Sequence, residues 1–193
     1  MESTQTEEAA ENRLVGKARS GDRQAFERLM TMHLPRVWRV VWRILRHGED
    51  TEDVVQEVFL AAHQALDSYR GASRFSTWLH RIAVNKALNH RARVAERLRR
   101  SSESLEHAGG SLDRPDPAAL SPLREMEMKE LRTRLAECME RLPDAWRAVL
   151  ALRVEESLSY EEIAEAVGTA LGTVRSRLAR ARLALRRCVE GES

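Results

Sequence analysis

Arginine side chains crowd the carboxyl-terminal part of the chain. Between residues 171 and 187 there are six arginines and no acidic residue. A guanidinium group donates paired hydrogen bonds, a geometry that suits the major-groove edge of guanine and the oxygens of a phosphate. The chemistry that this segment could perform is therefore recognition of a nucleic acid. The arginines are Arg175, Arg177, Arg180, Arg182, Arg186 and Arg187.

Two short helices are predicted to position these arginines. Apolar residues recur at helical spacing in residues 158–168 and again in residues 172–185. Gly168 is predicted to end the first helix, and Gly172 with Thr173 to supply the turn and the N-cap of the second. Two helices joined by a glycine-containing turn make a helix-turn-helix, whose second helix enters the major groove of DNA.

The second helix of this motif has one side that stays open to the groove. Because residues of an α-helix advance by ~100° each, an inward stripe of Val174, Leu178 and Ala181 leaves four residues on the opposite side. We predict that the two arginines among them read bases. Arg177 and Arg182 lie further round the helix and are predicted to contact phosphates. The four residues are Arg175, Ser176, Ala179 and Arg180.

The composition is typical of an all-helical protein. The chain has 193 residues, of which 5% are aromatic and 32% are charged, with long runs of Ala, Leu, Arg and Glu. Its net charge is only +2, but a second basic segment at 81–100 contrasts with acidic segments at 1–11 and 49–57. Two basic zones with acid elsewhere indicate two contacts with a polyanion and a separate surface for a protein partner.

The apolar content of the chain argues against export and membrane insertion. The amino terminus is acidic and lacks an apolar signal core, and no stretch of ~18 apolar residues occurs. We therefore expect a cytoplasmic protein with no membrane insertion.

The helical pattern divides the chain into two domains. Residues 1–11 form an acidic tail, and helical periodicity runs over residues 12–100. The pattern stops in a linker rich in Ser, Gly and Pro at 101–122 and resumes over 123–190. The predicted fold class is all-α, with two small helical domains joined by a flexible linker, the second containing the helix-turn-helix.

Some element boundaries in the first domain follow from single residues. Pro35 is predicted to lie in the first turn of a helix, and Gly48 to end that helix. A polar loop is predicted at 67–74. In the helix that follows it, Trp78 is predicted to belong to the core, in preference to stacking on a base.

Four segments, spread over both domains, resemble a known family when taken together and in order. They read Asp53-Val-Val-Gln-Glu-Val-Phe59, Tyr69-Arg-Gly-Ala-Ser-Arg-Phe-Ser-Thr-Trp-Leu-His-Arg-Ile-Ala-Val-Asn85, Leu158-Ser-Tyr-Glu-Glu-Ile-Ala164 and Gly172-Thr-Val-Arg-Ser-Arg-Leu178. The set looks like the extracytoplasmic-function (ECF) sigma factors of bacterial RNA polymerase. The resemblance covers nearly the whole chain apart from the tail and the linker.

The resemblance implies an alternative sigma factor, the subunit that gives RNA polymerase its promoter specificity. In that family the first domain (here 12–100) docks on the polymerase clamp and captures the melted −10 element. The second (here 123–190) binds the polymerase flap and reads the −35 element as duplex. The implied partners are therefore the RNA polymerase core and promoter DNA, and a dedicated anti-sigma factor is expected.

The resemblance also assigns candidate DNA contacts. A flipped base needs a pocket, stacking surfaces and cations for phosphates, and in the family the loop and the helix after it provide them. The −10 candidates are Tyr69, Arg70, Ser73, Arg74, Arg81, Asn85 and Asn89. The −35 candidates are Thr173, Arg175, Ser176, Arg177, Ala179, Arg180 and Arg182. Several relatives carry a bulky residue where this chain has Ala179, so its −35 preference is expected to differ there.

One acidic helix face is the candidate contact with the polymerase core. Asp53, Gln56 and Glu57 are predicted to point away from the apolar stripes of their helix. By similarity to the family, this face meets the coiled coil of the clamp. The alternative is an ordinary solvated helix face.

Two other classes of function compete with this one. The six histidines show no metal-binding HExxH pattern, and the chain has no phosphate-binding glycine loop, so no enzyme, cofactor or metal is expected. His80 and His90 are interpreted as solvent-exposed or beside phosphate. An autonomous DNA-binding regulator would explain the helix-turn-helix, but it leaves the first domain without a purpose.

The two cysteines leave one question open. Cys138 and Cys188 lie far apart in the sequence and form no CxxC pair. A pair of reduced, half-buried thiols is the simpler interpretation for a cytosolic protein, and a disulfide between them stays open.

Overall fold

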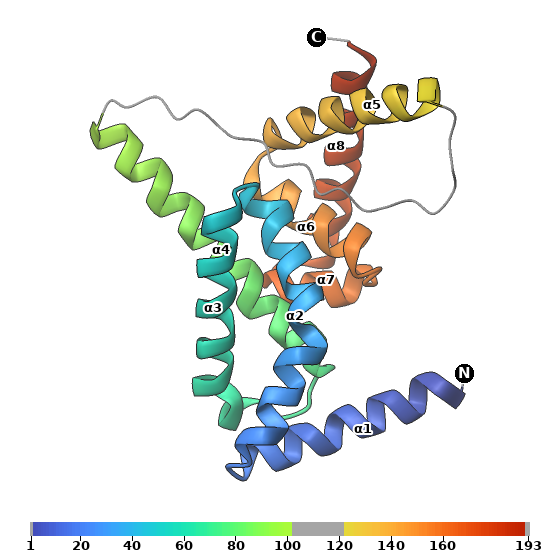
Figure 1. Ribbon diagram of the computed structural model, residues 1–193. Helices are drawn as coiled ribbons and strands as arrows, with labels where there is room; N and C mark the ends of the chain where they lie inside the picture. The colour runs from blue at the N-terminus through green and yellow to red at the C-terminus, as the bar shows by residue number, and fades with distance from the viewer. Residues whose placement is uncertain (1, 102–121, 192–193) are drawn as a thin grey trace.

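The computed structural model describes residues 2–101 and 122–191, and within these ranges every regular element is a helix (Figure 1). The predicted all-α fold class is therefore confirmed. The linker predicted at 101–122 lies, apart from its two end residues, outside the described residues. The elements are α1 Glu2–Arg19, α2 Arg23–Leu45, α3 Gly48–Ala65, the 3-10 turn η1 Leu66–Ser68, α4 Phe75–Ser101, α5 Pro122–Glu140, α6 Asp144–Glu155, α7 Tyr160–Val167 and α8 Leu171–Glu190.

Helix α2 is the centre of the first domain. It packs against α1, α3 and α4, and Val37, Val41 and Ile44 along it are completely buried. Within the acidic tail predicted at 1–11, residues 2–11 are part of α1. This helix is tied to α2 where Glu11 lies 2.6 Å from Nε2 of the buried His33.

Two predicted boundaries in this domain are wrong. Pro35 does not begin a helix but lies inside α2. Proline removes one backbone hydrogen bond, yet the buried side chains on both sides of it keep the helix continuous. Helix α2 ends instead at Leu45, with Arg46 as a left-handed C-cap at a φ of 61°, and Gly48 is the first residue of α3.

The second domain is built on α6, α7 and α8. Val149, Leu152, Ile163, Val174 and Leu178 are at most 1% exposed and form its centre. Helix α5 lies across the carboxyl-terminal half of α8 at one end of the molecule (Figure 1).

The two domains pack directly on each other. Helix α6 lies against α2 and helix α7 against α4, so that the buried side chains form one continuous core. The completely buried Arg147 of α6 joins the two domains. Its guanidinium donates to the carbonyl of Ile44, at the end of α2, at 2.9 Å, and to the carbonyls of Met139, Glu140 and Leu142 at 2.7–3.0 Å. A cation at the carboxyl ends of two helices is favoured by both helix dipoles.

Ion pairs surround this contact. Nε of Arg43 on α2 lies 2.7 Å from Glu155, and Arg39 lies 3.5 Å from both Glu155 and Glu156. Burial raises the pKa of Glu156, while Arg36 and Arg39 oppose that rise. The carboxyl end of α6 therefore presents acid to a basic face of α2.

Candidate nucleic-acid interface

The helix-turn-helix is formed by α7 and α8. Ser159 begins α7 with a capping box, in which its hydroxyl accepts from the backbone N–H of Glu162 and the Glu162 carboxylate accepts from the N–H of Ser159. Gly168 ends α7 with a φ of 62°, as its position in the sequence predicts. The predicted N-cap at Thr173 is wrong, because α8 begins at Leu171 with Ala170 as its N-cap. The helix therefore starts before Gly172.

The open side of α8 is where the helical spacing predicts it. Val174, Leu178 and Ala181 are at most 1% exposed and pack on α6 and α7. The hydroxyl of Ser176 donates to the Thr173 carbonyl at 3.1 Å, so its lone pairs remain available as acceptors. All four residues predicted to face the groove are exposed: Arg175, Ser176, Ala179 and Arg180.

The other −35 candidates lie at the margins of this side. Arg182 is exposed, while Arg177 and Thr173 are half-buried. Arg186 lies one turn further along the helix and forms an ion pair, with its Nε 2.9 Å from Oε1 of Glu190. The basic character of the groove-facing side therefore comes from Arg175, Arg180 and Arg182.

The loop between η1 and α4 is held by Tyr69. This side chain is only 7% exposed, and its ring contacts the rings of Phe75 and Trp78. Its hydroxyl donates to the Ser73 carbonyl at 2.6 Å, which closes the loop on itself. Gly71, between Tyr69 and Ser73 in the sequence, has a left-handed φ of 72°. Trp78 packs against the core, as predicted.

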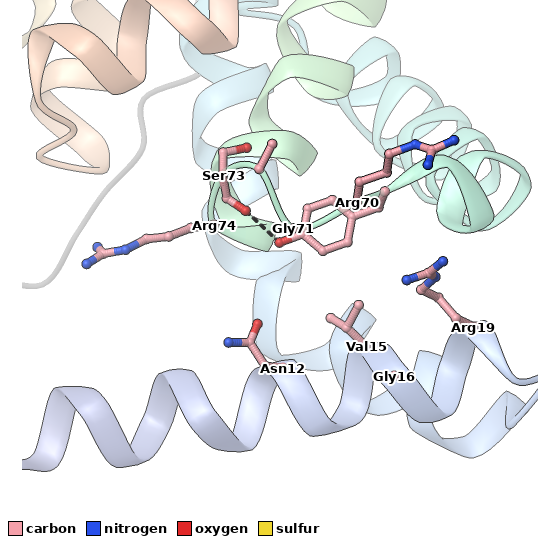
Figure 2. A pocket seen from close by; sticks show the side chains of 10 residues that line it. Asn12, Val15, Gly16, Arg19, Arg70, Gly71, Ser73 and Arg74 are labelled. Carbon is pink, nitrogen blue, oxygen red and sulfur yellow. Dashed lines mark hydrogen bonds between the residues drawn. The ribbon is translucent and has the colours of Figure 1, made fainter.

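A pocket of about 480 Å³ opens between this loop and α1 (Figure 2). The loop contributes the −10 candidates Tyr69, Arg70, Ser73 and Arg74 to its wall. Its opposite wall comes from α1, which the sequence did not single out for function. The α1 residues are Asn12, Val15, Gly16 and Arg19, and their i, i+3, i+4, i+7 spacing is the signal that could have found them.

Helix α4 carries the other −10 candidates. Arg81, Asn85 and Asn89 are all exposed and follow one another at four-residue spacing, so they share one face. The carboxyl-terminal part of α4 projects away from the body of the molecule (Figure 1) and extends this face with further basic residues.

The acidic face of α3 is only partly free. Asp53 and Gln56 are exposed, and the neighbouring Leu60 is 61% exposed. Glu57, in contrast, is half-buried and lies 3.2 Å from Nζ of Lys86 and 3.7 Å from Arg93. Of the three candidates for the polymerase contact, Glu57 is thus already engaged with α4.

The interpretation of His80 as solvent-exposed or phosphate-adjacent is wrong. Its side chain is buried against the other domain, with Nε2 3.8 Å from Glu156. Burial lowers the pKa of His80 to about 3, and His33, Arg36 and Arg39 add to the effect. His90 is half-buried and lies 3.3 Å from Asp50.

No group of His, Cys, Asp or Glu suited to a metal ion occurs among residues 2–101 and 122–191. Within the same residues, no helix is both long enough and apolar enough to cross a membrane.

Comparisons with known proteins find matches for both domains of the chain. The sequence matches the family model for sigma-70 region 2 over residues 29–100 and that for sigma-70, region 4 over residues 132–185. It is 39% identical over 186 residues to the ECF RNA polymerase sigma-E factor of Escherichia coli K12, covering 93% of this chain and 94% of that protein.

Two solved structures share the fold over most of the chain. One is CnrH in complex with the cytosolic domain of CnrY, with a TM-score of 0.68, 26% identity, and coverage of 95% of this chain and 99% of that one. The other is the sigma factor RpoE of Bartonella quintana in complex with the anti-sigma factor NepR, with a TM-score of 0.68 and 21% identity. That match covers 87% of this chain and 98% of that one.

Proposed function

We propose that the two domains of this chain divide promoter recognition between them. The premise is that the chain belongs to the extracytoplasmic-function family of RNA polymerase sigma factors. The protein is an alternative sigma factor that directs promoter-specific transcription. Its relatives are specificity subunits, so we propose that it has no catalytic activity of its own and acts in the cytoplasm, beside polymerase and DNA.

The second domain reads the −35 element as duplex. The single observation that carries this proposal is the side of α8 on which Arg175, Ser176, Ala179 and Arg180 are exposed. Arg175 and Arg180 read base edges, since arginine paired with guanine is the commonest specific contact in the major groove. Arg182 and the half-buried Arg177 hold phosphates, and Thr173 lies at the end of α8 that enters the groove.

The first domain captures the melted −10 strand. The pocket between α1 and the loop has the size of a small-ligand site and takes one extruded base. Arg19, Arg70 and Arg74 line this pocket and supply cations for the flanking phosphates. The exposed Arg81, Asn85 and Asn89 of α4 contact the neighbouring nucleotides.

Helix α3 docks on the clamp through its exposed part. Asp53 and Gln56 offer one carboxylate and one amide to basic residues of the polymerase, and Leu60 adds an apolar contact beside them. Glu57 instead holds α3 against α4 through its ion pair with Lys86, and contributes less to the contact with the clamp. The second domain contacts the flap, as expected for the family.

The packed arrangement of the two domains is the form that an anti-sigma factor holds. The −10 and −35 elements lie about 25 base pairs apart, or about 85 Å of B-DNA. A compact chain of this length has a radius of gyration of about 16 Å. The domains must therefore separate at the pairs of Arg39 and Arg43 with Glu155 and Glu156 before both elements are bound. The solved complex with NepR, whose sigma factor has this fold, supports the proposal.

A gel-shift experiment with and without polymerase core tests the function. The protein alone is expected to bind promoter duplex weakly, and the protein with core polymerase to form a stable complex that starts transcription at a defined site. Tight binding of duplex by the protein alone, with no transcription when core is added, would instead indicate an autonomous DNA-binding regulator.

A further inference from the structure

The two cysteines of the chain are bonded to each other. Cys138, near the end of α5, and Cys188, near the end of α8, form a disulfide with their Cα atoms 5.8 Å apart and a sequence separation of 50. We propose that this bond is a reversible redox site that fixes α5 on α8 when oxidised and releases α5 when reduced. The proposal goes beyond the promoter recognition described above.

The surroundings of Cys188 suit a reactive sulfur. Its side chain is half-buried, and Nη1 of the exposed Arg141 lies 3.9 Å from its Sγ. Arg134 donates to the adjacent carbonyl of Val189 at 3.4 Å. Cations beside a partly exposed cysteine stabilise the thiolate, which is the form that reacts. Cys188 is therefore the sulfur that an oxidant meets first, and the buried Cys138 is the sulfur that resolves it.

Among the described residues of α5, few contacts other than this bond and the hydrogen bond of Arg134 hold the helix on α8. The large apolar side chains described before the bond are exposed, with Met126 at 66%, Leu131 at 44% and Leu135 at 39%. Among the side chains of α5 that the structure describes, Ala136 is half-buried and Cys138 is the first that is fully buried. Segments with few buried apolar contacts open locally at low free-energy cost. When the bond is reduced, the part of α5 before Cys138 is thus free to leave α8.

The position of α5 is also connected to the contact between the domains. Immediately after Cys138, the carbonyls of Met139 and Glu140 accept hydrogen bonds from Arg147, which also binds the carbonyl of Ile44 in the first domain. A bond that fixes the end of α5 therefore also fixes the acceptors that orient Arg147. Oxidation supports the packed arrangement, and reduction loosens it.

The oxidant that forms the bond between Cys138 and Cys188 is a hydroperoxide, which takes up the two electrons that the thiols lose. The Cys188 thiolate attacks the peroxide, the O–O bond breaks, and a sulfenic acid and water (or an alcohol) result. The Cys138 thiolate then attacks the sulfenic sulfur, the S–S bond forms, and a second water leaves. Two electrons pass from the two thiols to the peroxide. A dithiol reductant reverses the bond through a mixed disulfide.

The first test uses the full wild-type chain, with no variant needed. After reduction and removal of the reductant, equimolar hydrogen peroxide is added, and free thiols are counted by maleimide labelling and mass spectrometry. We expect two labelled thiols before oxidation, none after it, and two again after dithiothreitol. Amide hydrogen exchange in α5 is expected to be at least about tenfold faster in the reduced protein. Thiols that stay free under peroxide, or equal exchange in the two states, would overturn the proposal.

Variants test which sulfur reacts first. In Cys138→Ser, dimedone is expected to trap a sulfenic acid at Cys188, whereas Cys188→Ser should leave the buried Cys138 largely unmodified. Arg141→Gln should slow peroxide oxidation about threefold or more, while Arg132→Gln, earlier in the chain on α5, serves as the charge-matched control. Equal rates in wild type and Arg141→Gln would contradict the role of this cation.

Discussion

Arg147 gives the sharpest prediction about how the two domains are held together. Replacing it with methionine keeps a long side chain but removes hydrogen bonds to four carbonyls, namely those of Ile44, Met139, Glu140 and Leu142. Each bond to a charged donor is worth about 1.5 kcal/mol or more. Methionine also avoids the cost of burying a charge, a cost reflected in the pKa of Arg147, which burial lowers to about 10.

The lost hydrogen bonds, offset by the avoided cost of burying the charge, leave a net loss of about 3 kcal/mol in the free energy of unfolding. For a chain of this size this lowers the melting temperature by about 6–12 °C. Only the bond to Ile44 crosses between the domains, so the packed arrangement itself loses about 1.4 kcal/mol, a tenfold change in its population. Urea denaturation measures the first effect, and the radius of gyration from solution X-ray scattering measures the second.

Arg153→Met is the matched control. Arg153 lies on the same helix but donates only within its own domain, to the carbonyl of Leu158 at 2.7 Å. We expect it to lose about 1 kcal/mol and to leave the radius of gyration unchanged. The reasoning is refuted if Arg147→Met is no less stable than Arg153→Met, or if both variants remain as compact as the wild type.

Three further predictions concern the remaining parts of the site. Because burial lowers the pKa of His80 to about 3, the unfolded state binds a proton below pH 6.5 that the folded state does not. Between pH 6.5 and 5.5 the wild type should thus lose about 1 kcal/mol more stability than His80→Gln, measured by urea denaturation. Asp53→Lys should weaken binding to core polymerase about tenfold in a fluorescence titration, and its melting temperature should stay unchanged because the side chain is exposed. The control is Glu27→Lys, an exposed charge reversal on α2, which should change neither the affinity for core polymerase nor the melting temperature. Gly71→Val should weaken binding of single-stranded −10 oligonucleotide about tenfold, since valine disfavours the φ of 72°, and should leave −35 duplex binding intact. A normal affinity for that oligonucleotide would contradict the assignment of the pocket.

The features that the sequence predicted correctly depend on neighbours in the chain. The face of α8 follows from a turn of ~100° per residue, and so the exposure of Arg175 and Arg180 and the burial of Val174 follow from residue spacing alone. The left-handed end of α7 at Gly168 was predictable for the same reason.

The features that the sequence missed depend on packing between distant segments. His80 was expected at the surface, but α6 of the other domain brings Glu156 against it. Pro35 was expected at a helix start, but the burial of Val37 and its neighbours carries α2 through it. The wall that α1 gives to the pocket, and the bond between Cys138 and Cys188, likewise join residues about 50 apart or more.

The most direct test of the central claim is selection of −35 sequences. A library with every −35 position randomised is transcribed by core polymerase with the wild type, Arg175→Ala, Arg180→Ala or Arg182→Ala, and the transcripts are sequenced. We predict that Arg175→Ala and Arg180→Ala each lose preference at particular positions, by about 1–3 kcal/mol of discrimination. Arg182→Ala should weaken all sequences alike and reduce the salt dependence by about one phosphate contact. A sequence preference that stays unchanged in the Arg175→Ala and Arg180→Ala variants would contradict the account.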